Sequence, residues 1–230
     1  MSFDVVPKSW QAASEQIGGG FFGYGMEQIT SAENQTLLAA REPRFGELWE
    51  RYGVPPEWER PPGYETLVRI ILEQQVHLNA AKATYERLNA TLPDFVPEEM
   101  LKLTDEEMLA ATVSRQKRRY LRELSRAVLD GTLVLEELPD LEPEVVREKM
   151  TAIVGIGNWT VDVYSMFCLK YPDIFPPGDV AALNQARTFL DTKERDEIVK
   201  IAATWSPVRT LATYTLWHVY LIERGRTYEM

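Results

Sequence analysis

From Met150 to Gln185 the chain reads MTAIVGIGNWTVDVYSMFCLKYPDIFPPGDVAALNQ. Gly155 and Gly157 lie between two segments whose apolar residues follow helical spacing, which predicts a tight hairpin joining two helices. The amides of Gly155, Gly157 and Asn158 fall at the start of the second helix. Unpaired N–H groups and the helix dipole favour an anion such as a phosphate there. A plain interhelix turn is the alternative interpretation.

The second feature of this stretch is an acidic residue behind a constrained loop. Pro176-Pro177-Gly178 leads into Asp179, directly before a helix predicted over residues 180–190. Two prolines restrict φ and so define the position of the carboxylate, and a helix N-terminus favours its ionised form. Asp179 is therefore an ordinary N-cap, worth about 1 kcal/mol to the helix, or a candidate catalytic carboxylate.

The rest of the chain also shows helical periodicity, punctuated by Pro and Gly. We expect helices near residues 31–52 (broken at Pro43), 67–72, 80–88, 97–103, 105–111, 116–129, 142–153, 159–170, 180–190, 194–205 and 207–224. No segment resembles a strand, so the predicted class is all-α. Residues 1–30, which include Phe21, Phe22 and Tyr24, are expected to form an irregular segment packed on a helical domain spanning residues 31–230.

Composition excludes several classes of protein. No apolar run approaches the roughly 18 residues that cross a membrane, and the N-terminus lacks a signal pattern. The single Cys168 excludes an intrachain disulfide and a four-cysteine iron–sulfur cluster, and His77 and His218 are the only histidines. We interpret Cys168 as a small buried apolar residue and His218 as structural. These features predict a cytoplasmic monomer that needs no cofactor.

The net charge of −10 argues against binding to nucleic acid, because phosphate neutralisation drives that affinity. A local exception begins at Ser114, where Arg115, Lys117, Arg118 and Arg119 follow closely. These basic residues form either a solvated helix face or part of a contact surface.

Taken together, the hairpin Val154–Thr160 and Asp179, 22 positions beyond Gly157, resemble the helix-hairpin-helix-GPD superfamily of DNA glycosylases. The resemblance covers roughly residues 64–220 and is greatest to the 3-methyladenine DNA glycosylase II group. It implies two helical lobes flanking a DNA-binding cleft. It also implies a double-stranded DNA partner containing damaged bases, and hence association with the nucleoid.

The resemblance also assigns roles to residues. Asp179 falls at the catalytic carboxylate, and Gly155, Gly157, Asn158 and Thr160 fall at the phosphate-binding hairpin. Gln75, in Leu72-Glu73-Gln74-Gln75-Val76, falls at the side chain that fills the gap left by a flipped base. Trp217 falls at the base pocket. The backbone carbonyls of Thr151, Ile153 and Ile156 fall at a structural monovalent cation. Ordinary helix-end polarity is the alternative for Gln74 and Gln75. His77 replaces the serine that is frequent in relatives, which leaves the contact there open.

Trp159 occupies the position where the bifunctional members of this superfamily carry a Schiff-base lysine. An indole cannot act as that nucleophile, so no lyase activity is expected, but it can stack on an electron-poor purine. A core tryptophan is the alternative. Asp162 lies one turn further along the helix, either as an exposed carboxylate or as an acid that supports the site.

These expectations combine into a monofunctional glycosylase for alkylated bases of the 3-methyladenine and 7-methylguanine type. A cationic base leaves readily, so the enzyme has mainly to stabilise the developing charge on the sugar, a role suited to Asp179. Trp159 and Trp217 would sandwich the base, with a cation–π contribution of about 1–2 kcal/mol. The alternatives are a glycosylase of the same fold for deaminated or mismatched bases, a non-catalytic DNA-binding hairpin protein, and a helical scaffold with no DNA role.

Overall fold

The computed structural model describes residues 28–226, and within that range it contains helices and no β-strand. The expected all-α class is confirmed. Residues 1–27, with Phe21, Phe22 and Tyr24, lie outside the described range. The helices are α2 Ala32–Arg41, α3 Arg44–Tyr52, α4 Tyr64–Glu73, α5 Leu78–Thr91, α6 Pro97–Lys102, α7 Asp105–Ala110, α8 Arg115–Leu129, the 3₁₀-helix η1 Leu135–Asp140, α9 Pro143–Thr151, α10 Asn158–Phe167, α11 Val180–Leu190, α12 Arg195–Ala203 and α13 Arg209–Ile222.

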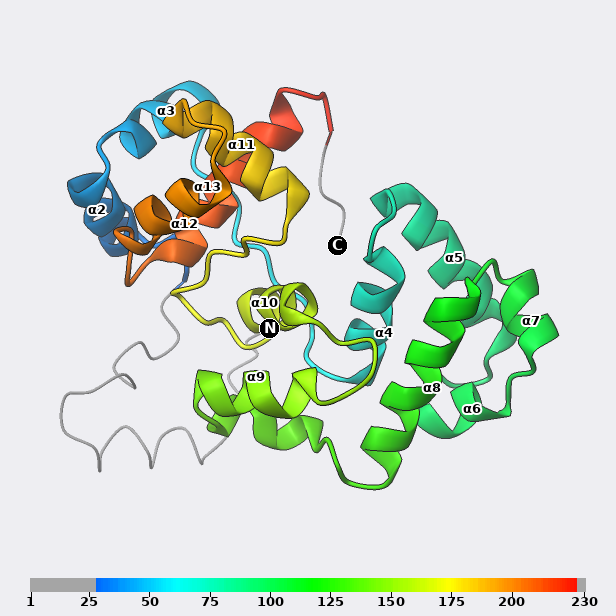
Figure 1. Ribbon diagram of the computed structural model, residues 1–230. Coiled ribbons are helices and arrows are strands. Elements are labelled where there is room, and N and C mark those ends of the chain that lie inside the picture. The colour runs from blue at the N-terminus through cyan, green and yellow to red at the C-terminus, as the bar shows by residue number, and fades with distance from the viewer. Residues whose placement is uncertain (1–27, 227–230) are drawn as a thin grey trace, which may run out of the picture.

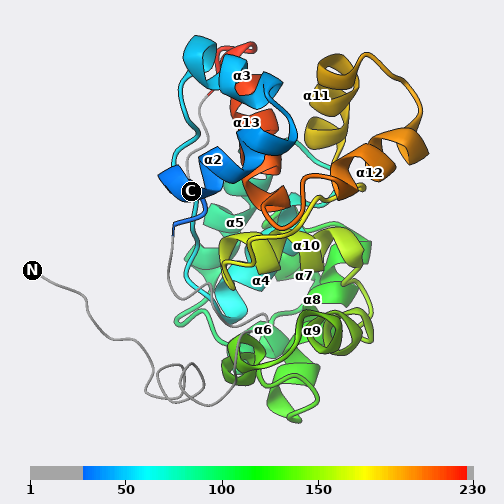
Figure 2. The ribbon, with the colours of Figure 1, turned by 90° about the vertical axis from the view of Figure 1, so that its left-hand side faces the viewer.

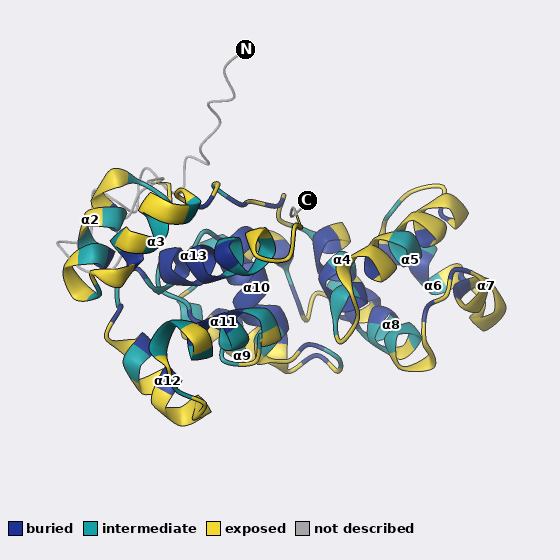
Figure 3. Ribbon diagram, turned by 90° about the horizontal axis from the view of Figure 1, so that it is seen from above, coloured by how far each residue is buried: buried dark blue, intermediate teal, exposed yellow. Residues whose placement is uncertain are grey.

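The helices form two lobes, and the chain passes from the first lobe to the second and back (Figure 1). One lobe contains α2, α3, α11, α12 and α13, so it is built from both ends of the described chain. The other contains α4 to α8, and the α9–α10 hairpin lies between, with α10 packed on α4. A view from the side and a view from above show the same division (Figures 2 and 3).

Local sequence signals account for the helix boundaries. The Ser114 hydroxyl caps α8 by accepting the Lys117 amide at 3.3 Å, and Gly131, with a φ of +76°, follows the end of that helix. A complete capping box between Thr104 and Glu107 starts α7. The helix η1 was not predicted, because a short turn containing Pro139 lacks a helical apolar period.

The lobes are joined by the irregular segment 53–63, which contains the two Pro-rich turns. Its buried Arg60 forms a two-pronged ion pair with Glu73 of α4, at 2.8 and 3.1 Å. The backbone amide of Arg60 also donates to the carbonyl of Phe167 in α10. The Tyr214 hydroxyl of α13 donates to the Trp58 carbonyl at 2.9 Å, so the crossing segment is bound from both sides.

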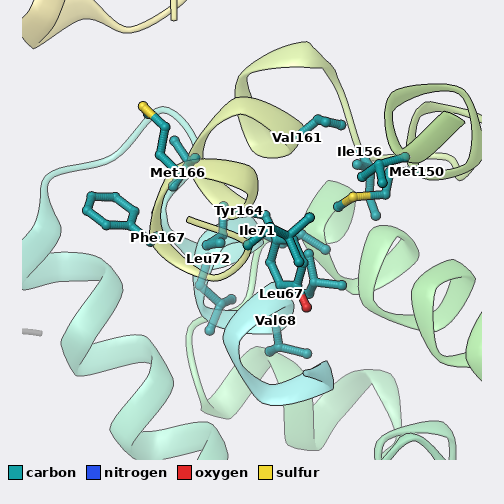
Figure 4. Close-up of a cluster of buried hydrophobic side chains, with 14 of the residues drawn as sticks. Leu67, Val68, Ile71, Leu72, Met150, Ile156, Val161, Tyr164, Met166 and Phe167 are labelled. Atoms are coloured by element: carbon teal, nitrogen blue, oxygen red, sulfur yellow. The ribbon is translucent and has the colours of Figure 1, made fainter. Parts of the chain in front are cut away.

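An apolar cluster holds the hairpin against α4. Ile156 of the turn and Val161 of α10 lie with Leu67 and Ile71 of α4 in this cluster, which Figure 4 shows in close-up. Tyr164 is fully buried there. Burial of apolar surface stabilises such contacts by roughly 25 cal/mol per Å², so the turn sits on a rigid support. No helix in the described part of the chain is long and apolar enough to cross a membrane.

Candidate active site and nucleic-acid interface

The hairpin turn depends on Gly155 for a steric reason. Its φ is +100°, and a Cβ built there would lie 2.2 Å from Cγ of Tyr120, which belongs to α8. Gly157 differs, because its φ of −101° suits any residue and a Cβ there would meet nothing within 4 Å. The fold therefore requires glycine at 155 only. Gly157 leaves open space beside the first turn of α10.

Gln74 fastens the turn from behind. Its Nε2 donates to the Gly155 carbonyl at 2.9 Å and to the Thr160 hydroxyl at 3.0 Å. Ordinary helix-end polarity is therefore the wrong interpretation of Gln74. Thr160 is 1 % exposed, so its hydroxyl braces the turn from inside. The Thr160 side chain is thus used within the fold, and the DNA-binding role expected for Thr160 stays a prediction.

A charged clamp on the other side joins α9 to α10. Arg147 Nη2 lies 2.7 Å from Asp162 Oδ1, and its Nη1 donates to Asn158 Oδ1 at 3.1 Å. Asp162 is 5 % exposed, which corrects the interpretation of an exposed helix carboxylate. Burial raises the pKa of Asp162, and the hydrogen bond from Arg147 counteracts part of that rise. Its residue type gave no sign of burial, because aspartate is rarely buried unless it is paired.

The expected cation ligands are backbone carbonyls of this same turn. Carbonyl oxygens suit hard cations, and the Ile153 carbonyl accepts the Ile156 amide at 3.0 Å, which uses one of its two lone pairs. The donor types thus fit a monovalent cation held by Thr151, Ile153 and Ile156, which stays a prediction. In the described range no group of three or more His, Cys, Asp or Glu side chains could hold a metal.

Gln75 occupies the short link between α4 and α5. Its φ is +57°, a conformation that non-glycine residues adopt rarely, and its side chain is exposed. The neighbouring Val76 and Leu78 are 46 % and 44 % exposed, and His77 is exposed too. The link therefore presents an amide and two apolar side chains to the outside.

Asp179 is held at the start of α11 by local geometry. Its amide donates to the Pro176 carbonyl at 3.0 Å, which closes the expected turn. Its Oδ1 accepts the Ala182 amide at 2.8 Å, so Asp179 is also the N-cap that a plain interpretation predicts. The side chain remains partly exposed.

The two predicted pocket tryptophans both reach this carboxylate. Trp159 Nε1 donates to Asp179 Oδ2 at 2.9 Å, and Trp217 Nε1 donates to Oδ1 at 2.9 Å. Three helices, α10, α11 and α13, thus converge on Asp179. Both indoles are partly exposed, and each also packs against the hydrophobic core, so Trp159 combines a core contact with an accessible face. With the Ala182 amide, three of the roughly four lone-pair sites of a carboxylate are used.

An aromatic wall, which sequence reasoning missed, backs Trp217. The ring of Phe167 stacks on Trp217 with centroids 5.6 Å apart and an interplanar angle of 11°, and Tyr214 stacks at 6.2 Å. Trp58 lies 6.4 Å from Trp217 at a tilt. These residues come from three separate segments, so only their shared aromatic character could have suggested the wall.

A second ion pair fixes the loop that carries Asp179. Arg209, at the start of α13, binds both carboxylate oxygens of Asp173, at 2.7 and 3.0 Å, and Ser206 Oγ donates to Asp173 at 2.7 Å. Burial alone would raise the pKa of Asp173, but the hydrogen bonds from Arg209 and Ser206 and the Arg209 charge outweigh it and lower that pKa. The loop is therefore tied to the helix that carries Trp217.

The basic run divides into two pairs. Lys117 Nζ donates to the Leu72 carbonyl at 2.7 Å, and burial lowers its pKa. Arg118 donates to the Asp105 carbonyl at 2.7 Å. Arg115 and Arg119 are exposed.

Elsewhere, Cys168 is half-buried, with burial raising the pKa of its thiol to about 12. His218 Nε2 lies 3.1 Å from the Tyr52 carbonyl, in keeping with a structural role.

Comparison with known proteins agrees with this fold. Residues 68–207 match the family model described as "HhH-GPD superfamily base excision DNA repair protein". The chain belongs to this superfamily.

Its relatives include members of the 3-methyladenine group. The chain is 32% identical over 185 residues to DNA-3-methyladenine glycosylase 1 of Schizosaccharomyces pombe, covering 76% of this chain and 79% of that protein. It is 30% identical over 165 residues to a putative DNA-3-methyladenine glycosylase of Bacillus subtilis, covering 67% of this chain but only 58% of that longer protein. A solved S. pombe 3-methyladenine DNA glycosylase in complex with abasic DNA aligns with a TM-score of 0.72 and 28% identity, over 81% of this chain and 95% of the other.

Proposed function

We propose that this protein is a monofunctional DNA glycosylase that hydrolyses the N-glycosidic bond of alkylated bases in duplex DNA. The observation that carries the proposal is the convergence of two indole N–H groups and one helix-start amide on the partly exposed carboxylate of Asp179. The relatives named for 3-methyladenine support the lesion class.

Asp179 is the catalytic carboxylate in this proposal. When the C1′–N bond breaks, its electron pair leaves with the base, and a cationic alkylated base departs as a neutral molecule. The sugar develops positive charge, which a fixed carboxylate stabilises without having to reorganise. Water then bonds to C1′, and its proton passes to a nearby base or to solvent. The unused lone pair on Oδ2 of Asp179 is available to orient that water.

The aromatic groups supply the base pocket. Trp159 and Trp217 flank Asp179, and the stack of Phe167 behind Trp217 limits how far that indole can move. A pocket of this kind selects by charge and shape, since an electron-poor base stacks and makes cation–π contacts with an indole. This places the lesion next to the carboxylate that its sugar requires.

The hairpin and the α4–α5 link position the DNA. In this proposal the amides of Gly155, Gly157 and Asn158 form the phosphate anchor, and the open space at Gly157 admits a close approach. Gln75, with its exposed neighbours Val76 and Leu78, fills the gap that a flipped base leaves in the stack.

The absence of lyase activity follows from the chemistry at Trp159. No lysine in the described chain forms a hydrogen bond or ion pair with Asp179, and Lys170 is engaged with Glu57 and Glu59 at 3.5 and 3.0 Å. An amine free to form a Schiff base is therefore not offered to C1′.

Methylated duplex DNA tests the proposal directly. The purified protein should release free methylated bases and leave abasic sites in intact strands, and borohydride should trap no covalent protein–DNA adduct. Duplex treated in parallel with the Asp179→Asn variant is the control for contaminating activity. If no base is released from methylated DNA, the proposed function is wrong, whereas equal release by the variant would remove Asp179 from the catalytic role. A trapped adduct would instead refute monofunctionality alone.

A further inference from the structure

A pair of exposed arginines on α8 borders the hairpin turn. Arg115 and Arg119 are one helical turn apart, and with Gln116 and Tyr120 they line an open hollow on the surface. The ring of Tyr120 is the group against which Gly155 is packed. The hollow and the turn therefore share a wall, and whatever binds one lies next to the other.

These arginines differ from the two basic residues between them. Lys117 and Arg118 use their donors on the carbonyls of Leu72 and Asp105, so both are part of the structure of their lobe. The side chains of Arg115 and Arg119 form no hydrogen bond and no ion pair in the structure over residues 28–226. The charge of Arg115 does act on the exposed carboxylate of Asp105, but no acceptor within that range occupies either guanidinium group, so both can bind an external anion.

Helix electrostatics also argue that an anion belongs here. Arg115 is the first residue of α8, and the first turn carries no acidic residue. Cations at a helix N-terminus are disfavoured by the macrodipole, and the arrangement is relieved when a negative group binds. The helix start and the two guanidinium groups all attract an anion. The paired N–H donors of a guanidinium group also match the spacing of phosphate oxygens.

We propose that Arg115 and Arg119 form a second phosphate-binding surface for the duplex whose backbone is anchored by the hairpin. This inference rests on the proposed function, because it assumes that the hairpin holds DNA. It also helps to account for DNA binding by a chain with a net charge of −10, since Arg115 and Arg119 place positive charge next to the hairpin. The proposed ligand of this surface is the DNA backbone, and its phosphates are bound independently of the base sequence.

The test compares two double variants of equal charge. Arg115→Gln/Arg119→Gln removes the surface, and Arg41→Gln/Arg51→Gln removes two exposed arginines from α2 and α3 in the other lobe. Kd is measured on a duplex containing a single abasic-site analogue, over a series of salt concentrations. Base release from methylated duplex is measured in single turnover at saturating protein.

The Arg115/Arg119 variant should bind about tenfold more weakly at 100 mM salt, and its plot of log Kobs against log [salt] should be less steep by about 0.9 per lost phosphate contact. The rate of base release at saturation should equal that of the wild type, because these residues lie outside the pocket. A Kd and slope equal to those of the Arg41/Arg51 control would overturn the proposal. If wild-type protein binds the duplex but releases no base, the glycosylase assignment fails. The comparison of Kd values still tests whether Arg115 and Arg119 form a phosphate-binding surface.

Discussion

The indole N–H of Trp159 lies 2.9 Å from Oδ2 of Asp179, and it connects the helix after the hairpin to the loop before α11. A residue that could be explained as a stacking surface is thus also a hydrogen-bond donor to the carboxylate. The donor orients the Asp179 carboxylate, as Trp217 does on the other oxygen. The two indoles that are proposed to contact the base therefore also hold the carboxylate that is proposed to act on its sugar.

Replacement of Asp179 by Asn should separate binding from chemistry. Asn is as good an N-cap as Asp, so α11 should form, but the neutral amide cannot stabilise a positive sugar. We expect base release to fall by about 100-fold or more, the scale of one electrostatic catalytic group. Asp191→Asn, at the exposed end of the same helix, is the matched control and should excise normally. Near-wild-type release by Asp179→Asn would remove this residue from its role.

Trp159→Phe keeps an aromatic face and removes the N–H donor. A hydrogen bond to a charged group contributes about 1.5–3 kcal/mol, so single-turnover release should slow by about 10- to 100-fold, while lesion binding changes little. Trp49→Phe removes an indole donor to Thr215 Oγ1 at 3.0 Å, away from Asp179, and serves as the control. Equal rates for the two variants would show that the Trp159 donor has no part in the reaction.

The two hairpin glycines should respond differently to alanine. Gly155→Ala forces a positive φ on alanine and a clash with Tyr120, so we expect a loss of roughly 2 kcal/mol or more in unfolding free energy. Gly157→Ala meets no protein atom and should fold normally, yet bind abasic duplex at least about tenfold more weakly because its methyl group intrudes on the phosphate. Thermal unfolding and Kd measured on both variants check this, and unchanged binding by Gly157→Ala would refute the anchor.

The Asp173–Arg209 ion pair should make the free energy of unfolding depend on pH in the acidic range. The pKa of Asp173 is lowered from its ordinary value of 3.8, so the pair stabilises the fold above that value and loses this contribution as pH falls through the lower, folded-state pKa. Asp173→Asn should therefore unfold more readily than wild type at pH 7, by about 1–3 kcal/mol. The difference should shrink below pH 3.8. Denaturant unfolding at several pH values measures this, and a difference independent of pH would contradict the assignment.

Helix positions were predictable because they depend on local chemistry. Pro43 separates α2 from α3, Ser114 and Gly131 bound α8, and the helix predicted over residues 180–190 is observed as Val180–Leu190. Caps, prolines and glycines act over a few residues, so one sequence contains their whole effect. The hairpin and the loop before Asp179 were predictable for the same reason, because nearby glycines and prolines determine them.

Other features depend on which distant residues meet. The distance in sequence from Trp159 through Asp179 to Trp217 is 58 positions. No local sequence signal predicts that both indole N–H groups donate to one carboxylate. The burial of Asp162 depends likewise on packing between helices, which gives Arg147 as its partner.

The sequence by itself determined an all-α chain with a glycine hairpin and a rigidly presented aspartate. These features follow from backbone conformational preferences and apolar periodicity. Only the tertiary structure decided which side chains serve the site and which serve the fold. It directs Gln74 inward to Gly155 and leaves Gln75 exposed, and it ties Lys117 to Leu72 while Arg119 stays free. Residues of the same type acquire different roles because a buried polar group must find a partner, whereas an exposed one remains available to a ligand.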